Sequence, residues 1–215
     1  MYKLNNNVFY VILFWGITME IHQKELEKIK EKIISDPSNY HYTLQNFFPV
    51  YSASALSKII IIGQAPSLKA QISKIAWNDL SGERLRNWLG VSKEIFYNLE
   101  FFSLIPMDFY YPGKNKTGDL PPRKDFAAKW HPQILANMPN VQLIILIGAY
   151  AQNYYLKGIK KDNLTNTVKA YKEYLPRYFP LVHPSPLNMR WQAKNPWFEK
   201  ELIFDLQKTI YHILN

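Results

Sequence analysis

The pattern of apolar and polar positions along the chain predicts strands and helices in alternation. Four short runs are apolar at nearly every position: residues 58–63, 101–106, 141–148 and 178–182. Runs of this length without polar alternation are typical of strands buried on both faces. Helical spacing of apolar residues predicts helices between them, near residue 82, over 129–138 and 149–156, and around 165–173. The alternation predicts a three-layer α/β/α sandwich with a central four-stranded parallel sheet.

Two further helices are expected at the ends of this pattern. Over residues 20–35, Ile21, Leu26, Ile29 and Ile33 recur at helical spacing among Glu and Lys. Residues 196–214 form a second amphipathic segment that closes the chain. We therefore expect one domain over residues 19–215, with a Pro-, Gly- and Lys-rich loop at 110–125.

Residues 8–19 form an apolar run preceded by a single lysine, Lys3. The run is too short to span a bilayer, and no small-residue cleavage site follows it. Three interpretations stay open: a signal or membrane anchor, a buried or disordered extension, or translation that begins at Met19. We favour the start at Met19, with residues 1–18 as an extension, and expect a cytoplasmic protein without membrane contact.

Composition and charge narrow the function classes. Hydrophobic residues make up 47% of the 215 residues and charged residues 20%, which describes a folded globular protein. The sequence contains no cysteine, which excludes disulfides, thiolate metal sites and iron–sulfur clusters. A net charge of +9 with 15% aromatic residues suits binding to phosphates and unstacked bases. A lysine-rich solvated surface would have the same composition, so charge alone does not decide.

Two unusual loops follow the first and last predicted strands. GQAPS occupies residues 63–67, and HPSPLN occupies residues 183–188. Because the carboxyl ends of parallel strands meet at one edge of a sheet, both loops can face one cleft. Gly63 allows close backbone approach, and the prolines stiffen both loops. A rigid polar cleft of this kind can stabilise charge that develops during a reaction.

These two loops, in this order, resemble motifs one and two of the uracil-DNA glycosylase superfamily. HPSPLN is similar to the leucine loop of its major members and to the corresponding loop of the single-strand-selective ones. Residues 76–90 (AWNDLSGERLRNWLG) resemble the family segment that carries the base-stacking aromatic residue. Residues 143–151 (LIILIGAYA) resemble the third strand of the family and the helix that follows it. The resemblance implies a uracil-DNA glycosylase-like fold and a monofunctional hydrolase for base excision repair. It also implies a monomer that acts on DNA without metal or cofactor.

The resemblance also implies roles for individual residues. His183 would stabilise the anion of the departing base, and Trp77 would stack on the flipped base while Gln64 and Ala65 line its pocket. Leu187 would fill the gap that the base leaves in the duplex. The residues expected to contact DNA are Ser67, Ser185, Leu187, Asn188 and Arg190.

The sequence departs from the family pattern at the carboxylate. Major members have an Asp in motif one where this chain has Ala65, and the iron–sulfur class has a Glu where it has Gln64. The remaining candidate is Asp79, which follows the aromatic residue, with Asp108 in reserve. The Asn by which uracil-specific members recognise the base is also missing near residues 105–106. Hypoxanthine or xanthine is therefore an alternative substrate, and a catalytically silent nucleic-acid-binding module is an alternative function.

Structural roles compete with these functional ones. Trp77 could belong to the core, and Asn188 could serve only to stabilise its turn. Asp79 stands where a helix begins and could be its N-cap. If Asp79 lies in the cleft near His183 the enzyme is favoured, whereas a cap outside the cleft favours the silent module. The other basic residues near the loops could contact phosphate or be solvated: Lys114, Lys116, Arg123, Lys124 and Lys194.

Overall fold

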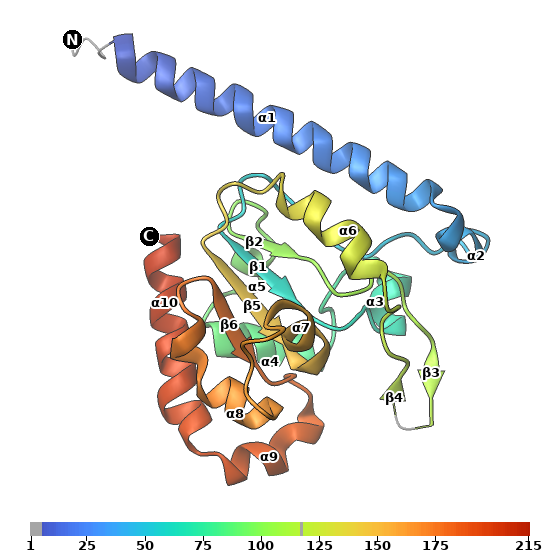
Figure 1. Ribbon diagram of the computed structural model, residues 1–215, viewed down its shortest axis with the longest axis vertical. Helices are drawn as coiled ribbons and strands as arrows, with labels where there is room; N and C mark the ends of the chain where they lie inside the picture. Colours follow the sequence, from blue (N-terminus) through green and yellow to red (C-terminus); the bar gives the residue numbers. More distant parts are fainter. Residues whose placement is uncertain (1–5, 117) are drawn as a thin grey trace.

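A four-stranded parallel sheet forms the centre of the computed structural model, which describes residues 6–116 and 118–215 and the side chains from residue 14 onward (Figure 1). The strand order is β2-β1-β5-β6, and every neighbouring pair is parallel. All residues of these four strands except Tyr178 are buried. The predicted α/β architecture and all four predicted strands are confirmed. Their bounds are β1 Ile59–Ile62, β2 Phe102–Leu104, β5 Leu143–Ile147 and β6 Tyr178–Leu181.

Side chains that alternate along β1 enter two separate cores. Ile60 and Ile62 pack in one apolar cluster with α1 (Asn6–Ser35), α6 (Phe126–Leu135) and α7 (Gly148–Tyr155). Ile59 and Ile61 pack in the other cluster. That second cluster includes side chains from α4 (Leu80–Leu89), α5 (Lys93–Phe96), α8 (Leu164–Lys169) and α10 (Phe204–Leu214). Helices therefore cover both faces of the sheet, as the apolar strands require.

Several helices differ from the sequence prediction in bounds or number. The helix expected over 129–138 is α6, which begins at Phe126 and ends at Leu135. The closing segment 196–214 divides into a π-helical stretch, Phe198–Ile203, and α10. Short elements without a periodic pattern were not predicted. These are η1 Pro37–Asn39, α2 Tyr40–Thr43, α3 Leu68–Ser73, α5, η3 Pro186–Asn188, α9 Met189–Lys194, β3 Lys114–Asn115 and β4 Gly118–Asp119. The helix expected around 165–173 divides into α8 and the short η2 Tyr171–Tyr174.

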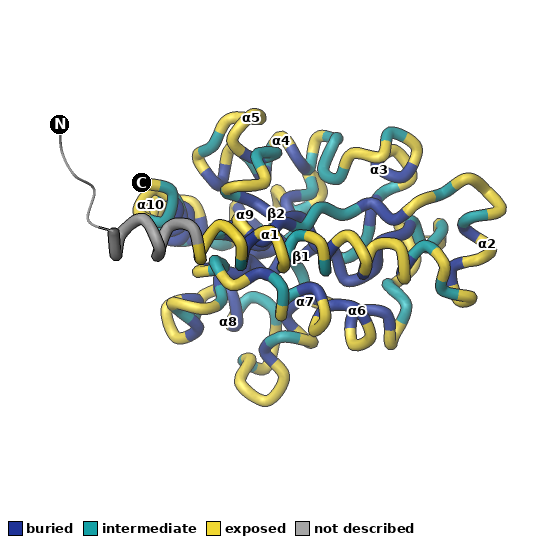
Figure 2. Tube along the Cα trace, turned by 90° about the horizontal axis from the view of Figure 1, so that it is seen from above, coloured by how far each residue is buried: buried dark blue, intermediate teal, exposed yellow. Residues whose placement is uncertain are grey.

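Helix α1 is longer than the predicted helix 20–35, because it continues through the apolar run (Figure 1). Met19, Leu26, Ile29 and Ile33 are buried against the domain, whereas Ile21, expected on the same face, is 56% exposed. Residues 14–17, the first residues of the helix whose burial is described, are exposed, and they include Phe14, Trp15 and Ile17 (Figure 2). Residues 1–5 of the expected extension lie outside the described residues. Within the described part of the chain, no helix combines the length and apolarity needed to cross a bilayer.

Candidate active site

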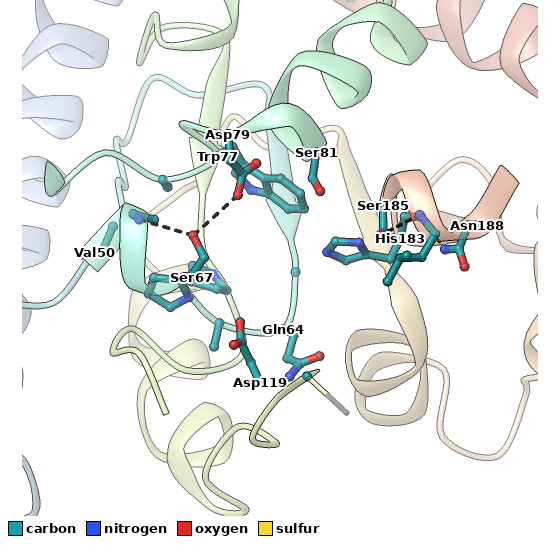
Figure 3. Close-up of a pocket in the computed structure, with 18 residues that line it drawn as sticks. Val50, Gln64, Ser67, Trp77, Asp79, Ser81, Asp119, His183, Ser185 and Asn188 are labelled. Carbon is teal, nitrogen blue, oxygen red and sulfur yellow. Dashed lines mark hydrogen bonds between the residues drawn. The ribbon is translucent and has the colours of Figure 1, made fainter. Parts of the chain in front are cut away.

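A pocket of about 530 Å³ opens at the carboxyl ends of β1 and β6. The GQAPS loop, the Trp77 segment and the HPSPLN loop all line it, as Figure 3 shows. The structure thus brings together all the predicted site residues except Arg190, which is exposed on α9. The predicted residues that line the pocket are Gln64, Ala65, Ser67, Trp77, Asp79, His183, Ser185, Leu187 and Asn188.

Trp77 is fixed by two close approaches to glycine. Its backbone adopts the left-handed conformation, with φ of 57°. A Cβ at Gly63 would lie 2.9 Å from Cζ2 of the Trp77 ring, and a Cβ at Gly82 would lie 1.7 Å from the Trp77 carbonyl oxygen. The ring is half-buried and its centroid lies 5.8 Å from that of His183. Trp77 therefore contacts the core through one part of its ring and presents another part to the pocket.

We expect Gly82→Ala to destabilise the protein, although alanine has the higher helix propensity. The new methyl group would overlap the Trp77 carbonyl oxygen, so the backbone must shift, at a cost of about 1–3 kcal/mol or more. Urea unfolding measures this loss. Gly16→Ala is the matched control, since nothing lies within 4 Å of its Cβ position in α1. A Gly82→Ala protein as stable as this control would contradict the packing described for Trp77.

The electrostatic environment of His183 favours a neutral imidazole. Burial lowers the pKa of His183 below its ordinary value, and the nearby carboxylates of Asp79 and Asp119 offset only part of this effect. A neutral imidazole at pH 7 retains one N–H donor. The side chain lies at the pocket, and Asn188 Nδ2 donates to its backbone carbonyl over 2.7 Å. His183 can therefore donate a hydrogen bond to an oxygen of a bound molecule.

The HPSPLN loop combines a constrained backbone with an exposed apolar tip. Ser185 Oγ accepts a hydrogen bond from the backbone N–H of Leu187, and Asn188 bonds back to His183. Arg84 of α4 donates to the Ser185 carbonyl oxygen at 3.5 Å and to Gln192 Oε1 at 2.5 Å. Leu187 itself is 90% exposed. The expected turn-stabilising role of Asn188 is thus observed, and it lines the pocket as well.

Asp79 combines the two arrangements that the sequence presented as alternatives. Its Oδ1 accepts the backbone N–H of Gly82 over 2.9 Å, which makes it the N-cap of α4. Its Oδ2 accepts the Ser67 hydroxyl at 3.5 Å, and the side chain lines the pocket. Each carboxylate oxygen therefore already has a donor within the protein.

Asp108, the reserve carboxylate, is not among the pocket-lining residues. It is fully buried and accepts Arg123 Nε at 2.7 Å and Nη2 at 2.8 Å, in addition to the backbone N–H groups of Tyr110 and Arg123. Arg123 is accordingly engaged in an ion pair, with a side chain that is 28% exposed. Its guanidinium lies 4.3 Å from the ring centroid of Phe126 and donates to Asn39 Oδ1 at 2.6 Å.

Sequence analysis missed Asp119, which lines the pocket from the hairpin of β3 and β4, a segment that gave no periodic signal. Of the two residues expected where uracil-specific members carry an Asn, Pro106 lines the pocket, whereas Ile105 is fully buried in the core. The other lining residues not singled out beforehand are Val50, Pro66, Ala70, Ala76, Ser81 and Gly118.

Comparison with known proteins places this pocket in a family context. Residues 48–207 match the family model described as the uracil DNA glycosylase superfamily. Among solved structures, the chain is similar to the NMR structure of a candidate uracil DNA glycosylase from Methanosarcina acetivorans, with 13% identity. That match covers 76% of this chain and 94% of the other, with a TM-score of 0.43.

Proposed function

Because the chain belongs to the uracil DNA glycosylase superfamily, we propose that it is a monofunctional DNA glycosylase that excises a deaminated base. The observation that carries this proposal is the placement of His183 and Trp77. Their rings, from separate loops, line one pocket with centroids 5.8 Å apart. A flat base between a stacking surface and a hydrogen-bond donor is the arrangement that excision of a flipped base requires.

His183 acts at the departing base. Breaking the N-glycosidic bond leaves negative charge on the base, which collects on a carbonyl oxygen. The N–H of neutral His183 donates to this oxygen and stabilises the anion as it forms. Because the imidazole is held in place before the substrate arrives, little reorganisation is needed during the reaction.

The exposed loop tip acts on the duplex. Leu187 extends into solvent beside the pocket and occupies the gap left by the extruded nucleotide. Ser67 and Ser185, together with the loop amides and Arg190, bind the flanking phosphates. The net charge of +9 supports this contact with a polyanion.

The pocket leaves the identity of the base open among deaminated bases. Pro106 offers no side-chain amide at the position where uracil-specific members read the base. Uracil, hypoxanthine and xanthine each present a carbonyl oxygen that His183 can bind. Excision of uracil is supported by the family, and the absence of that amide supports the two purines.

A cleavage assay on labelled oligonucleotides tests the proposal. Single- and double-stranded substrates with uracil, hypoxanthine or xanthine are incubated with the protein and then with alkali, which cuts at abasic sites. We expect strand scission at one or more of these bases and none in undamaged DNA. Salt-dependent DNA binding without any strand scission would instead favour a catalytically silent nucleic-acid-binding module. The presence of Ala65 in place of the motif-one carboxylate is consistent with that alternative.

A further inference from the structure

We propose that Asp119, on the hairpin formed by β3 and β4, is the catalytic carboxylate that binds and deprotonates the attacking water. The inference rests on the proposed glycosylase function and supplies the group that Ala65 lacks. No local motif marks this residue, because the hairpin is distant in sequence from both signature loops.

Asp119 occupies the pocket itself. It lines the same cavity as His183 and Trp77. In Figure 3, Asp119 and Gln64 lie on one side of the pocket, opposite Asp79 and Trp77, with His183 at the end of the gap between them. The carboxylate is also near enough to His183 to act electrostatically on its imidazole. A water bound to Asp119 would therefore lie in the same pocket as the flipped nucleotide.

Of the three carboxylates considered, Asp119 has the most freedom to accept a proton. Asp79 accepts from Gly82 and Ser67, and Asp108 is paired with Arg123. Within the described residues, no hydrogen bond or ion pair engages the side chain of Asp119, which is exposed at the pocket mouth. A carboxylate with open acceptor positions can hold a water molecule and take its proton.

The hairpin is held against the pocket at several points. Gln64 Nε2 donates to the carbonyl oxygen of Leu120 over 3.0 Å, which joins the residue after Asp119 directly to motif one. The backbone N–H of Leu120 donates to Gly113 at 2.9 Å, and the Asp108–Arg123 ion pair joins the two ends of the segment. Asp119 is thus placed before substrate binds, as catalysis requires.

The reaction balances with water as the only co-reactant. The N-glycosidic bond breaks, and its electron pair leaves with the base. The water oxygen bonds to the anomeric carbon while one of its protons passes to the Asp119 carboxylate. Asp119 then releases that proton to solvent, and the base anion takes one up, which yields the free base and an abasic sugar.

Single-turnover excision by Asp119→Asn is the decisive measurement, made with whichever damaged oligonucleotide the wild-type protein cleaves. We expect the rate constant to fall by about 10²–10⁴-fold, the usual range for loss of a general base. DNA affinity, measured by fluorescence anisotropy, should be unchanged or tighter because a negative charge is removed. Asp125→Asn is the matched control: the same exchange at an exposed residue outside the pocket, where the side chain makes no capping bond.

Asp79→Asn separates the two pocket carboxylates. Asparagine is also a good N-cap, so this variant retains the start of α4. If Asp119→Asn cleaves as fast as Asp125→Asn in an active protein, the role proposed for Asp119 is overturned, and loss of activity in Asp79→Asn alone would transfer it to Asp79. If the wild-type protein cleaves no substrate, the proposed function fails and this inference fails with it.

Discussion

His183→Ala is expected to lower the rate constant for base excision by about 10²–10³-fold, which corresponds to roughly 2.7–4 kcal/mol of lost transition-state stabilisation. The imidazole is the donor proposed for the departing base, and alanine leaves the developing anion without it. Single-turnover cleavage of the preferred substrate measures the effect. His212→Ala, at an exposed position on α10, is the control and should cleave at the wild-type rate.

Comparison of the wild-type protein with His183→Ala also reports on the protonation state of His183. Burial lowers the pKa of this histidine in the folded protein, so as pH falls the unfolded chain takes up the proton first. The histidine therefore reduces stability below its ordinary pKa of about 6.5. The wild-type protein should lose more stability than His183→Ala between pH 7 and pH 5. If both proteins lost the same stability between pH 7 and pH 5, and His183→Ala kept the wild-type excision rate, His183 would not be the neutral donor proposed here.

The sheet and the position of its functional edge were predictable because their signals are local. In β1, four consecutive isoleucines require apolar surroundings on both faces, and the two cores provide them. The loops that follow β1 and β6 then had to share an edge of the sheet. That topological fact brings Gln64 and His183 to one pocket, whereas Trp77, in the segment before α4, was expected there only from the family resemblance.

The N-terminal bound of α1 was not predictable from amphipathic spacing. Residues 8–19 are apolar at most positions, so no periodic face distinguishes a helix there. The run contains no proline, and the helix continues through it. Apolar periodicity identifies the face that a helix buries. It does not identify a helical segment whose described side chains, such as Phe14, are exposed to solvent.

The carboxylates show why the rest of the site needed coordinates. Gln64 and Leu120 are joined by a hydrogen bond across 56 positions of sequence, and no spacing rule connects them. Asp79 is both a helix cap and a pocket residue, so the two alternatives drawn from its sequence position were not exclusive. Asp108 follows the second strand of the chain and Arg123 lies in the Pro-, Gly- and Lys-rich loop, so their ion pair is visible only in the folded structure.

Arg123→Met is expected to destabilise the folded protein by about 3–5 kcal/mol, the range for breaking a buried ion pair by removing one partner. The Asp108 side chain is 0% exposed and Arg123 is 28% exposed, so methionine would leave a buried carboxylate without its ion-pair partner. The hydrogen bond to Asn39 and the contact with the Phe126 ring would also be lost. Urea or thermal unfolding measures the change.

Two comparisons separate loss of the ion pair from loss of a long side chain. Lys24→Met removes a lysine whose pair with Glu20 is mostly exposed, and it should not alter stability measurably. In a double-mutant cycle, Asp108→Asn should recover part of the loss caused by Arg123→Met, because the uncompensated charge disappears. Additive effects would show that Arg123 acts mainly through its contacts with the aromatic rings and Asn39. The Asp108–Arg123 pair joins the two ends of the segment that carries Asp119. Loss of the pair in Arg123→Met should therefore also loosen the hairpin and lower the excision rate.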